Sequence, residues 1–389
     1  MTKTVLFVSE LGGGRGHIAR LSAVASIAKA LGYSTVLAIR AENRFDRTQS
    51  GGPFDRVLEG PRFPRLKNVP PIFQVAGLAA TLARVGFVDH CVITPILAQW
   101  QALLSELNPT IVVGDFAPYA RLASLGRVPF LMVGSGYTLP TSEGLLPFPQ
   151  SDARRDPSQL INHILKTVNE SLFASDEGPI EDPSLCLRGD WNAVACVPLL
   201  DPTAGRHPKE YFGPFEDFPP EQTRSTNERK IYVYLHSLSE QDLREIDSLA
   251  NAGYSIDMYC DGLSDEHPKR ASKLATPRSL SEIVKNYGCV LHQGGLGLST
   301  FCLQAAIPQF LLPKHTEASL TAKKLRAIGC AAVLTSRSAE QGANSSVSEF
   351  QQLLEPASTK ARREIAVETR DWIKRHDWRK RLHAILTSS

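Results

Sequence analysis

The feature that most constrains the fold is an alternation of short apolar runs with amphipathic runs, which occurs twice along the chain. In the first 135 residues the runs TVLFVS, STVLAIR, TIVVGDF and PFLMVGSG are rich in β-branched and other apolar residues, and helical patterns separate them. The alternation resumes at KIYVYLHS, residues 230–237. This pattern predicts an α/β protein with two parallel sheets, each covered by helices on both faces.

Length and prolines divide this pattern into domains. A chain of 389 residues exceeds what one hydrophobic core usually supports. Between about residues 139 and 220 the alternation stops, and the proline cluster YFGPFEDFPP ends that stretch. We therefore expect two facing Rossmann-like domains with a cleft between them. The expected parts are an N-terminal domain over 1–210, a linker over 211–228, a C-terminal domain over 229–360 and a charged helical segment over 361–389.

Composition argues against several classes of partner. Lys and Arg number 43 against 40 Asp and Glu, and no basic run stands out, so we expect no nucleic-acid partner. The seven cysteines are scattered without a Cys-x-x-Cys pair, which argues against a disulfide framework or a zinc site. No apolar run approaches the roughly 18 residues of a membrane span, and the N-terminus lacks the pattern of a signal peptide. We expect a cytoplasmic protein with no transmembrane segment.

The stretch VLHQGGLGLST, residues 290–300, is a candidate ligand site. A strand ends at His292, glycines follow, and a helix begins. Glycines let a ligand approach the backbone closely, and the unpaired N–H groups and dipole of a helix N-terminus attract anions. The pattern predicts a phosphate site, although a tight strand-to-helix turn without a ligand would use the same glycines.

A second glycine-rich stretch, LGGGRGHIAR at residues 11–20, follows the first strand. His17 begins the helix there, where its imidazole could accept a proton near neutral pH. Asp115 ends a later strand of the same sheet, so the carboxylate could meet the imidazole and orient it. The alternatives are that His17 caps the first turn of its helix and that Asp115 caps the helix of APYARLASL.

Taken together, these motifs resemble GT-B glycosyltransferases of the UDP-glycosyltransferase, or glycosyltransferase family 1-like, type. That family carries roughly His-Gly-Gly-x-Gly-Thr, a helix, Gly-Val-Pro, an apolar strand and then Pro with Asp/Glu-Gln. Residues 288–334 are similar to this segment, and PRSLSEIV at 277–284 resembles the loop that receives the nucleotide base. FGP at 212–214 resembles the family's entry to the linker, and GGGRGH resembles its Gly-x-Gly-His.

The resemblance implies roles for individual residues. It makes His17 the base that deprotonates an acceptor hydroxyl and Asp115 the partner of that base. It also implies that the C-terminal segment packs back on the N-terminal domain. Donor binding is assigned to a larger set, which comprises Gly14, Ser237, Arg278, Ser279, Leu280, His292, Gln293, Gly294, Gly295, Gly297, Leu298, Ser299 and Glu317.

The chain departs from the family at positions that usually contact the donor. Gln293 stands where the family has a pyrophosphate-binding His, and Phe301 stands where a Glu holds the ribose hydroxyls. Ala318 replaces a sugar-contacting Gln, and Thr321 replaces an Asn. Gln293 can donate a neutral hydrogen bond but supplies no positive charge. These changes leave the nucleotide and the sugar of the donor open.

The activity that the resemblance implies is inverting glycosyl transfer. The donor would be of the UDP or dTDP type, and the acceptor would be a hydroxyl of a small molecule or glycoconjugate, as in natural-product glycosylation. The nucleotide sugar is a co-substrate, and no cofactor is expected. The chain contains no Asp-x-Asp pair, which commonly holds the divalent ion of metal-dependent transferases, so we expect a metal-independent reaction.

Three alternatives stay open on the sequence alone. GRGHIA, residues 14–19, fits the Gly-x-Gly-x-x-Ala fingerprint of dinucleotide-binding proteins. Arg40 after the second strand would suit the 2′-phosphate of NADP, so an oxidoreductase is possible. The departures at Gln293, Phe301 and Ala318 would permit a non-catalytic partner of another transferase. A non-hydrolysing sugar-nucleotide epimerase would use the same fold.

Overall fold

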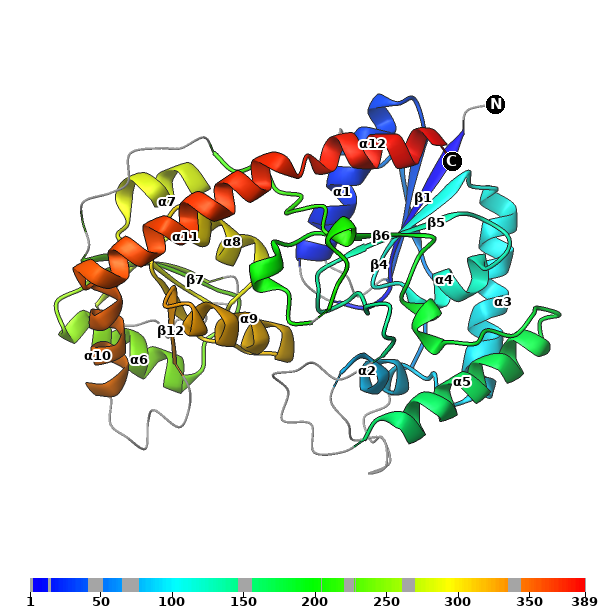
Figure 1. Ribbon diagram of the computed structural model, residues 1–389, viewed down its shortest axis with the longest axis horizontal. Helices are drawn as coiled ribbons and strands as arrows, with labels where there is room; N and C mark the ends of the chain where they lie inside the picture. Colours follow the sequence, from blue (N-terminus) through cyan, green and yellow to red (C-terminus); the bar gives the residue numbers. More distant parts are fainter. Residues whose placement is uncertain are drawn as a thin grey trace. The chain divides into compact units, whose positions relative to one another are not determined.

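We describe the fold from a computed structural model of the chain (Figure 1). The structure describes residues 3–12, 15–40, 52–64, 77–145, 156–203, 205–219, 227, 229–260, 270–334 and 344–388. The chain divides into two compact units. Unit 1 comprises Met1–Cys196, Asp201–Glu216 and His376–Ser389, and unit 2 comprises Val197–Leu200 and Asp217–Arg375.

Unit 1 is built on a parallel sheet of six strands in the order β3-β2-β1-β4-β5-β6. This is the strand order of a Rossmann fold. The strands are β1 (Thr4–Ser9), β2 (Ser34–Ile39), β3 (Arg56–Glu59), β4 (Ile111–Asp115), β5 (Phe130–Gly134) and β6 (Trp191–Val194). Strands β4 and β5 are buried over their whole length, because helices cover both faces of a parallel sheet.

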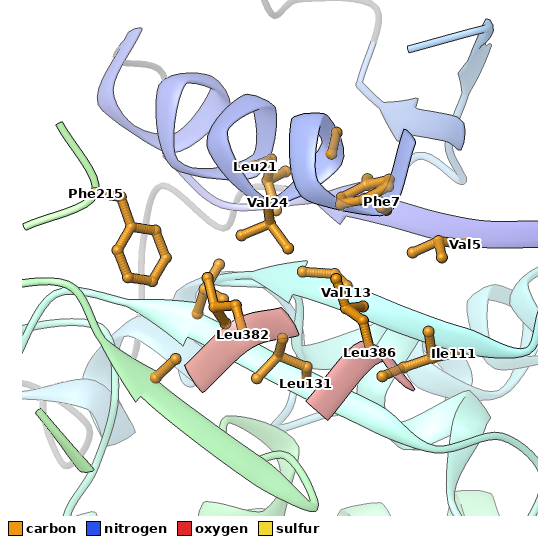
Figure 2. Packing of buried hydrophobic residues seen from close by; sticks show 14 of the residues in the cluster. Val5, Phe7, Leu21, Val24, Ile111, Val113, Leu131, Phe215, Leu382 and Leu386 are labelled. Atoms are coloured by element: carbon orange, nitrogen blue, oxygen red, sulfur yellow. The ribbon is translucent and has the colours of Figure 1, made fainter. Parts of the chain in front are cut away.

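Helices pack on both faces of the unit 1 sheet. On one face, Leu21 and Val24 of α1 (Arg15–Ala30) lie over Val113 of β4, and α12 (Trp378–Ser388) adds Leu382 to the same core (Figure 2). The helices drawn on the other face in Figure 1 pack against one another. They are α2 (Leu78–Arg84), α3 (His90–Leu107), α4 (Pro118–Ser124) and α5 (Ser158–Phe173).

Unit 2 repeats the same strand order as β9-β8-β7-β10-β11-β12, again all parallel. The strands are β7 (Lys230–Leu235), β8 (Ser255–Cys260), β9 (Ala271–Lys273), β10 (Cys289–His292), β11 (Gln309–Leu311) and β12 (Ala331–Val333). Alternate residues of β7 face opposite ways, since Val233 packs with one set of helices and Tyr232 with the other. The first set is α6 (Glu240–Asn251) and α10 (Asn344–Leu354). The second is α7 (Leu280–Asn286), α8 (Leu296–Gln304), α9 (Thr316–Ala327) and α11 (Pro356–Arg375).

The two predicted parallel sheets of an α/β protein are thus confirmed, but the stretch over 139–220 holds more regular structure than its sequence indicated. Its described residues include helix α5, strand β6 and the short 3-10 turns η2 (Pro183–Cys186), η3 (Pro198–Leu200) and η4 (Pro208–Glu210). Strand β6 has four residues at the edge of the sheet, which is too short for a clear period. Helix α5 does carry a period, because Leu160, Ile164, Val168 and Leu172 are spaced by four and buried.

The C-terminal segment expected over 361–389 divides between the units. Helix α11 packs with unit 2, where Arg362 and Ala366 are buried, and the chain enters unit 1 only at His376. Trp378 of α12 then stacks on Phe215, with ring centroids 4.9 Å apart. The division falls between α11 and α12, because the apolar side chains of α11 pack into the core of unit 2 and those of α12 pack into the core of unit 1. Among the described residues, none of the helices combines the length and the apolar character needed to cross a membrane.

Candidate active site

In unit 1, strands β1 and β4 lie side by side at the centre of the sheet. The chain continues from β1 to β2 on one side and from β4 to β5 on the other. Ligands of open α/β sheets bind beyond the carboxyl ends of such strands. Ser9, the last residue of β1, pairs with Asp115, the last residue of β4. Because α1 follows β1 after a short loop, its first turn starts at the same edge, which places His17 near Asp115.

The structure brings His17 and Asp115 into contact. Nδ1 of His17 lies 2.8 Å from Oδ1 of Asp115. The carboxylate is fully buried, whereas 13% of the imidazole surface is exposed. Because an ionised carboxylate only accepts hydrogen bonds, the proton of the neutral imidazole belongs on Nδ1. Nε2 is then the nitrogen with a lone pair to accept another proton.

Arg20, which the sequence did not single out, completes this cluster. Its Nε donates to Oδ2 of Asp115 at 2.7 Å, and its Nη2 lies 3.1 Å from Nδ1 of His17. Burial on its own raises the pKa of Asp115, but the positive charge of Arg20 and the contact with His17 outweigh burial and hold that pKa below its ordinary value. The signal that could have identified Arg20 is its position three residues after His17, on the same face of α1.

A different carboxylate caps helix α4, the helix that Asp115 might have capped. Oε2 of Glu10 accepts from the backbone N–H of Tyr119 at 2.8 Å, and Oε1 accepts from that of Ala120 at 2.9 Å. The N-cap residue Ala117 provides no side-chain hydrogen bond. The capping alternative for Asp115 is therefore wrong, and its carboxylate is turned toward His17 and Arg20.

Gly12 packs directly against the imidazole of His17. Its φ is 98°, a left-handed conformation that favours glycine. A Cβ atom at this position would lie only 2.2 Å from Nε2 of His17. The lack of a side chain at Gly12 therefore makes room for the imidazole ring of His17 itself. Gly14, expected to contact the donor, lies outside the described residues.

In unit 2, the strands in the corresponding place are β7 and β10, and the glycine loop follows β10. His292, at the end of β10, is buried beneath this loop. Its Nδ1 accepts from the N–H of Gly294 at 3.1 Å, so its Nε2 carries the proton and donates to Oε1 of Gln309 at 3.0 Å. Burial lowers the pKa of His292 to about 4, although the bond to Gln309 opposes this shift. His292 thus supports the loop from within the core as a neutral imidazole.

The N-terminus of α8 is open to solvent. Gly295 is its N-cap, and a Cβ atom there would meet nothing within 4 Å. The first amides of the helix, at Leu296, Gly297 and Leu298, have no intrahelical acceptor, and glycine has no side chain to cap them. The buried hydroxyl of Ser299 has no hydrogen-bond partner among the residues that the structure describes. Donors and helix dipole together can bind an anion.

Gly294 has a φ of 85°, and a Cβ atom there would approach the carbonyl oxygen of Ala318 to 3.1 Å. The close passage of the loop over α9 therefore requires this glycine and the small buried Ala318 beneath it. Phe301 is buried in the unit 2 core, with its ring stacked on Phe218 at 6.3 Å between centroids. Phe301 thus belongs to the hydrophobic core. Gln293 is half-buried in the loop itself.

The remaining positions expected to bind the donor have structural contacts or lie at the surface. Ser279 caps α7, since its hydroxyl accepts from the N–H of Glu282, whose carboxylate accepts from the N–H of Ser279. The backbone N–H of Arg278 donates to the Tyr232 hydroxyl at 3.1 Å. Ser237 is exposed after β7, Leu280 packs as the first residue of α7, and Glu317 lies in the first turn of α9. Their part in donor binding stays a prediction.

No protein-family model matches the sequence, and no curated protein matches it. Solved structures match over nearly the whole chain. CalG4, the calicheamicin glycosyltransferase, has a TM-score of 0.72 at 16% identity over 100% of this chain and 98% of that one. The glycosyltransferase SnogD from Streptomyces nogalater has a TM-score of 0.61 at 16% identity, over 99% and 100% of the two chains. The spinosyn rhamnosyltransferase SpnG complexed with thymidine diphosphate has a TM-score of 0.61 at 16% identity, over 95% and 96%.

At these identities the likeness establishes the fold. The chain has the GT-B fold of these glycosyltransferases, as its two glycine-rich motifs indicated.

Proposed function

We propose that the protein is a glycosyltransferase that moves a sugar from a nucleoside diphosphate to a hydroxyl group of an acceptor. The observation that carries this proposal is the pair of His17 and Asp115. A partly exposed imidazole and a buried carboxylate lie 2.8 Å apart at the carboxyl ends of β1 and β4, in a chain with the GT-B fold. The match to a structure that holds thymidine diphosphate supports a nucleoside diphosphate as the leaving group.

In the proposed reaction, Nε2 of His17 takes the proton from the acceptor hydroxyl as its oxygen attacks the anomeric carbon. The new carbon–oxygen bond forms on the face opposite the phosphate, so the configuration inverts. The bond between the anomeric carbon and the phosphate oxygen breaks, and the nucleoside diphosphate leaves with the electron pair. Asp115 stabilises the imidazolium that results and holds it in position.

We assign the diphosphate to the N-terminus of α8. The uncapped amides that follow Gly295 and the hydroxyl of Ser299 are donors for phosphate oxygens, and the helix dipole favours negative charge there. Such donors stabilise a developing negative charge without a metal ion. Together with the lack of an Asp-x-Asp pair, they support a metal-independent reaction.

The donor and the acceptor are proposed by class. Matched structures include a calicheamicin glycosyltransferase and a spinosyn rhamnosyltransferase. We propose a hydroxyl of a small-molecule natural product as the acceptor and a UDP or dTDP sugar as the donor. We also propose a reducing, cytoplasmic location, because the seven cysteines of the sequence are scattered and include no Cys-x-x-Cys pair.

The three alternative functions can be weighed against individual contacts and against the products that each would release. Arg40, which would hold the 2′-phosphate of NADP, is buried with its guanidinium 4.4 Å from the centre of the Phe63 ring. That position disfavours an oxidoreductase. The contact between His17 and Asp115 is an arrangement that a non-catalytic partner would not need. An epimerase would convert the sugar nucleotide without releasing the nucleotide.

The first test is a thermal-shift panel of UDP, dTDP, GDP, their sugars and NADPH. A nucleoside diphosphate should raise the melting temperature by mass action, and NADPH should not. Ser299→Ala should reduce this shift. Thr300→Ala is the matched control, because that hydroxyl is equally buried but bonded to the Leu296 carbonyl at 2.8 Å. A shift with NADPH and none with any nucleoside diphosphate would contradict the proposal.

The second test detects transfer by mass spectrometry, with a panel of hydroxylated acceptors and the donor that binds best. His17→Ala should lower the rate by about 100-fold or more, as loss of a general base does, while leaving the nucleotide-induced thermal shift intact. The proton NMR coupling at the anomeric carbon of the product reports inversion. A His17→Ala variant as active as the wild type would exclude His17 as the base.

A further inference from the structure

We propose that Arg20 is a positioning residue that tunes the base. In this proposal its guanidinium fixes the carboxylate of Asp115, and its positive charge opposes a second positive charge on the imidazole of His17. The inference rests on the proposed function of His17 and adds a third residue to it.

The contacts between Arg20 and Asp115 fix the plane of the carboxylate. Nε of Arg20 donates to Oδ2 at 2.7 Å, and Nη2 lies 3.4 Å from Oδ1. Oδ1 is also the atom that meets Nδ1 of His17. Both carboxylate oxygens are therefore held, and the arginine side chain is only 9% exposed. A buried pair of charges is screened by salt much less than a surface pair.

Arg20 attracts the carboxylate of Asp115, but it would repel a protonated, positively charged imidazole of His17. Nη2 lies 3.1 Å from Nδ1. A guanidinium has only donors, and Nδ1 donates its own proton to Asp115, so no hydrogen bond joins the two nitrogens. A second positive charge on the imidazole would stand against the charge of Arg20. Asp115 favours the imidazolium form of His17 and Arg20 disfavours it, so the guanidinium opposes the effect of the carboxylate on the same ring.

Among the described residues, Glu216 is a further charged group that interacts with Arg20, and it lies in the Asp201–Glu216 segment of unit 1. Burial raises the pKa of Glu216, and the charge of Arg20 opposes that rise. Arg20 thus interacts with Asp115, which ends β4, and with Glu216. His17 lies on α1, the same helix as Arg20. Arginine keeps its proton throughout the range in which histidine titrates. Arg20 therefore acts as a fixed positive charge beside the imidazole.

The test is a pH titration of the His17 ring nitrogens by NMR in the free protein labelled with nitrogen-15, with signals assigned by their loss in His17→Gln. This readout needs no substrate, so it separates failure of this inference from failure of the proposed function. In the wild type the proton should be on Nδ1. In Arg20→Met the midpoint of the titration should move to higher pH by roughly one unit, the lower end of the effect of a neighbouring charge.

Arg20→Lys keeps the positive charge but loses the planar guanidinium that donates to both carboxylate oxygens. The midpoint of the His17 titration in this variant should therefore stay near that of the wild type. Arg121→Met is the matched control, because Arg121 is a buried arginine of unit 1 paired with Asp190 at 3.2 Å, away from the dyad. It should lose stability without moving the midpoint. With an active donor and acceptor, the acid limb of the kcat/KM profile should move in the same direction as the midpoint in Arg20→Met.

Three results would overturn the inference. One is a folded Arg20→Met protein whose midpoint equals that of the wild type. Another needs no variant of Arg20: a wild-type His17 with its proton on Nε2 would show that Nδ1 does not donate to Asp115. A shift in Arg20→Lys as large as in Arg20→Met would likewise exclude a role for the charge itself.

Discussion

The replacement of Gly12 by alanine tests the geometry of the site most directly. The new Cβ atom would lie 2.2 Å from Nε2 of His17, whereas ordinary contacts begin near 3.4 Å. The imidazole would have to retreat by about 1 Å, and a displacement of that size in a catalytic group costs about 100-fold in rate. The φ of 98° adds strain for any residue with a side chain, about 1–2 kcal/mol.

Gly12→Ala should therefore lose about 100-fold in kcat, equivalent to about 2.7 kcal/mol of activation free energy, and 1–2 kcal/mol of unfolding free energy. The matched control is Gly32→Ala. Gly32 has a φ of 83° and lies in the turn that follows α1 in the same unit, but an added Cβ would meet nothing within 4 Å. It should show the same loss of stability and nearly full activity.

The assays are denaturant unfolding for stability and product formation for activity. The nitrogen-15 signals of His17 give a third measurement, since a displaced ring loses its bond to Asp115. The reasoning would be refuted by a Gly12→Ala protein that keeps wild-type activity, or by equal losses of activity in both glycine variants.

Three further predictions concern donor binding and stability. Gly295→Ala should unfold at nearly the same denaturant concentration as the wild type but bind nucleoside diphosphates at least tenfold more weakly by calorimetry. The reason is that its Cβ would enter the open space at the N-terminus of α8, where the diphosphate is proposed to bind. Unchanged affinity would show that the diphosphate does not bind there. In the wild type, the pKa of His292 is depressed in the folded state, so the stability that its neutral form confers is present above its ordinary pKa and is lost as pH falls toward 4. His292→Gln should therefore show a smaller fall in unfolding free energy between about pH 6.5 and pH 4, as measured by urea unfolding. A pH dependence identical to that of the wild type would contradict this. Asp115→Asn should lower the unfolding free energy at pH 7 by about 3 kcal/mol or more, because it removes the buried carboxylate charge that the guanidinium of Arg20 meets at 2.7 Å. That difference should shrink as pH falls through the depressed pKa of Asp115, and a constant difference down to acid pH would count against the ion pair.

The sequence by itself determined the class of fold and the place of the two loops. Continuous apolar runs such as those of β4 and β5 occur when both faces of a strand are covered, and this fact is local enough to be visible without coordinates. Glycines after strands β1 and β10 similarly showed where the backbone turns into a helix. From strand ends alone, Asp115 could be expected near His17, because parallel strands share one carboxyl edge.

Tertiary structure decided which of the possible partners each side chain takes. Asp115 could have capped α4, but Glu10, more than a hundred residues earlier, occupies that position, and the carboxylate is directed at His17 and Arg20. The same holds for His292, whose imidazole belongs to the core because Gln309 of the neighbouring strand meets it there. Hydrogen bonds and charges act over a few ångströms in space, whatever the distance along the chain. A sequence therefore gives the candidates for such contacts, and only the packed fold selects among them.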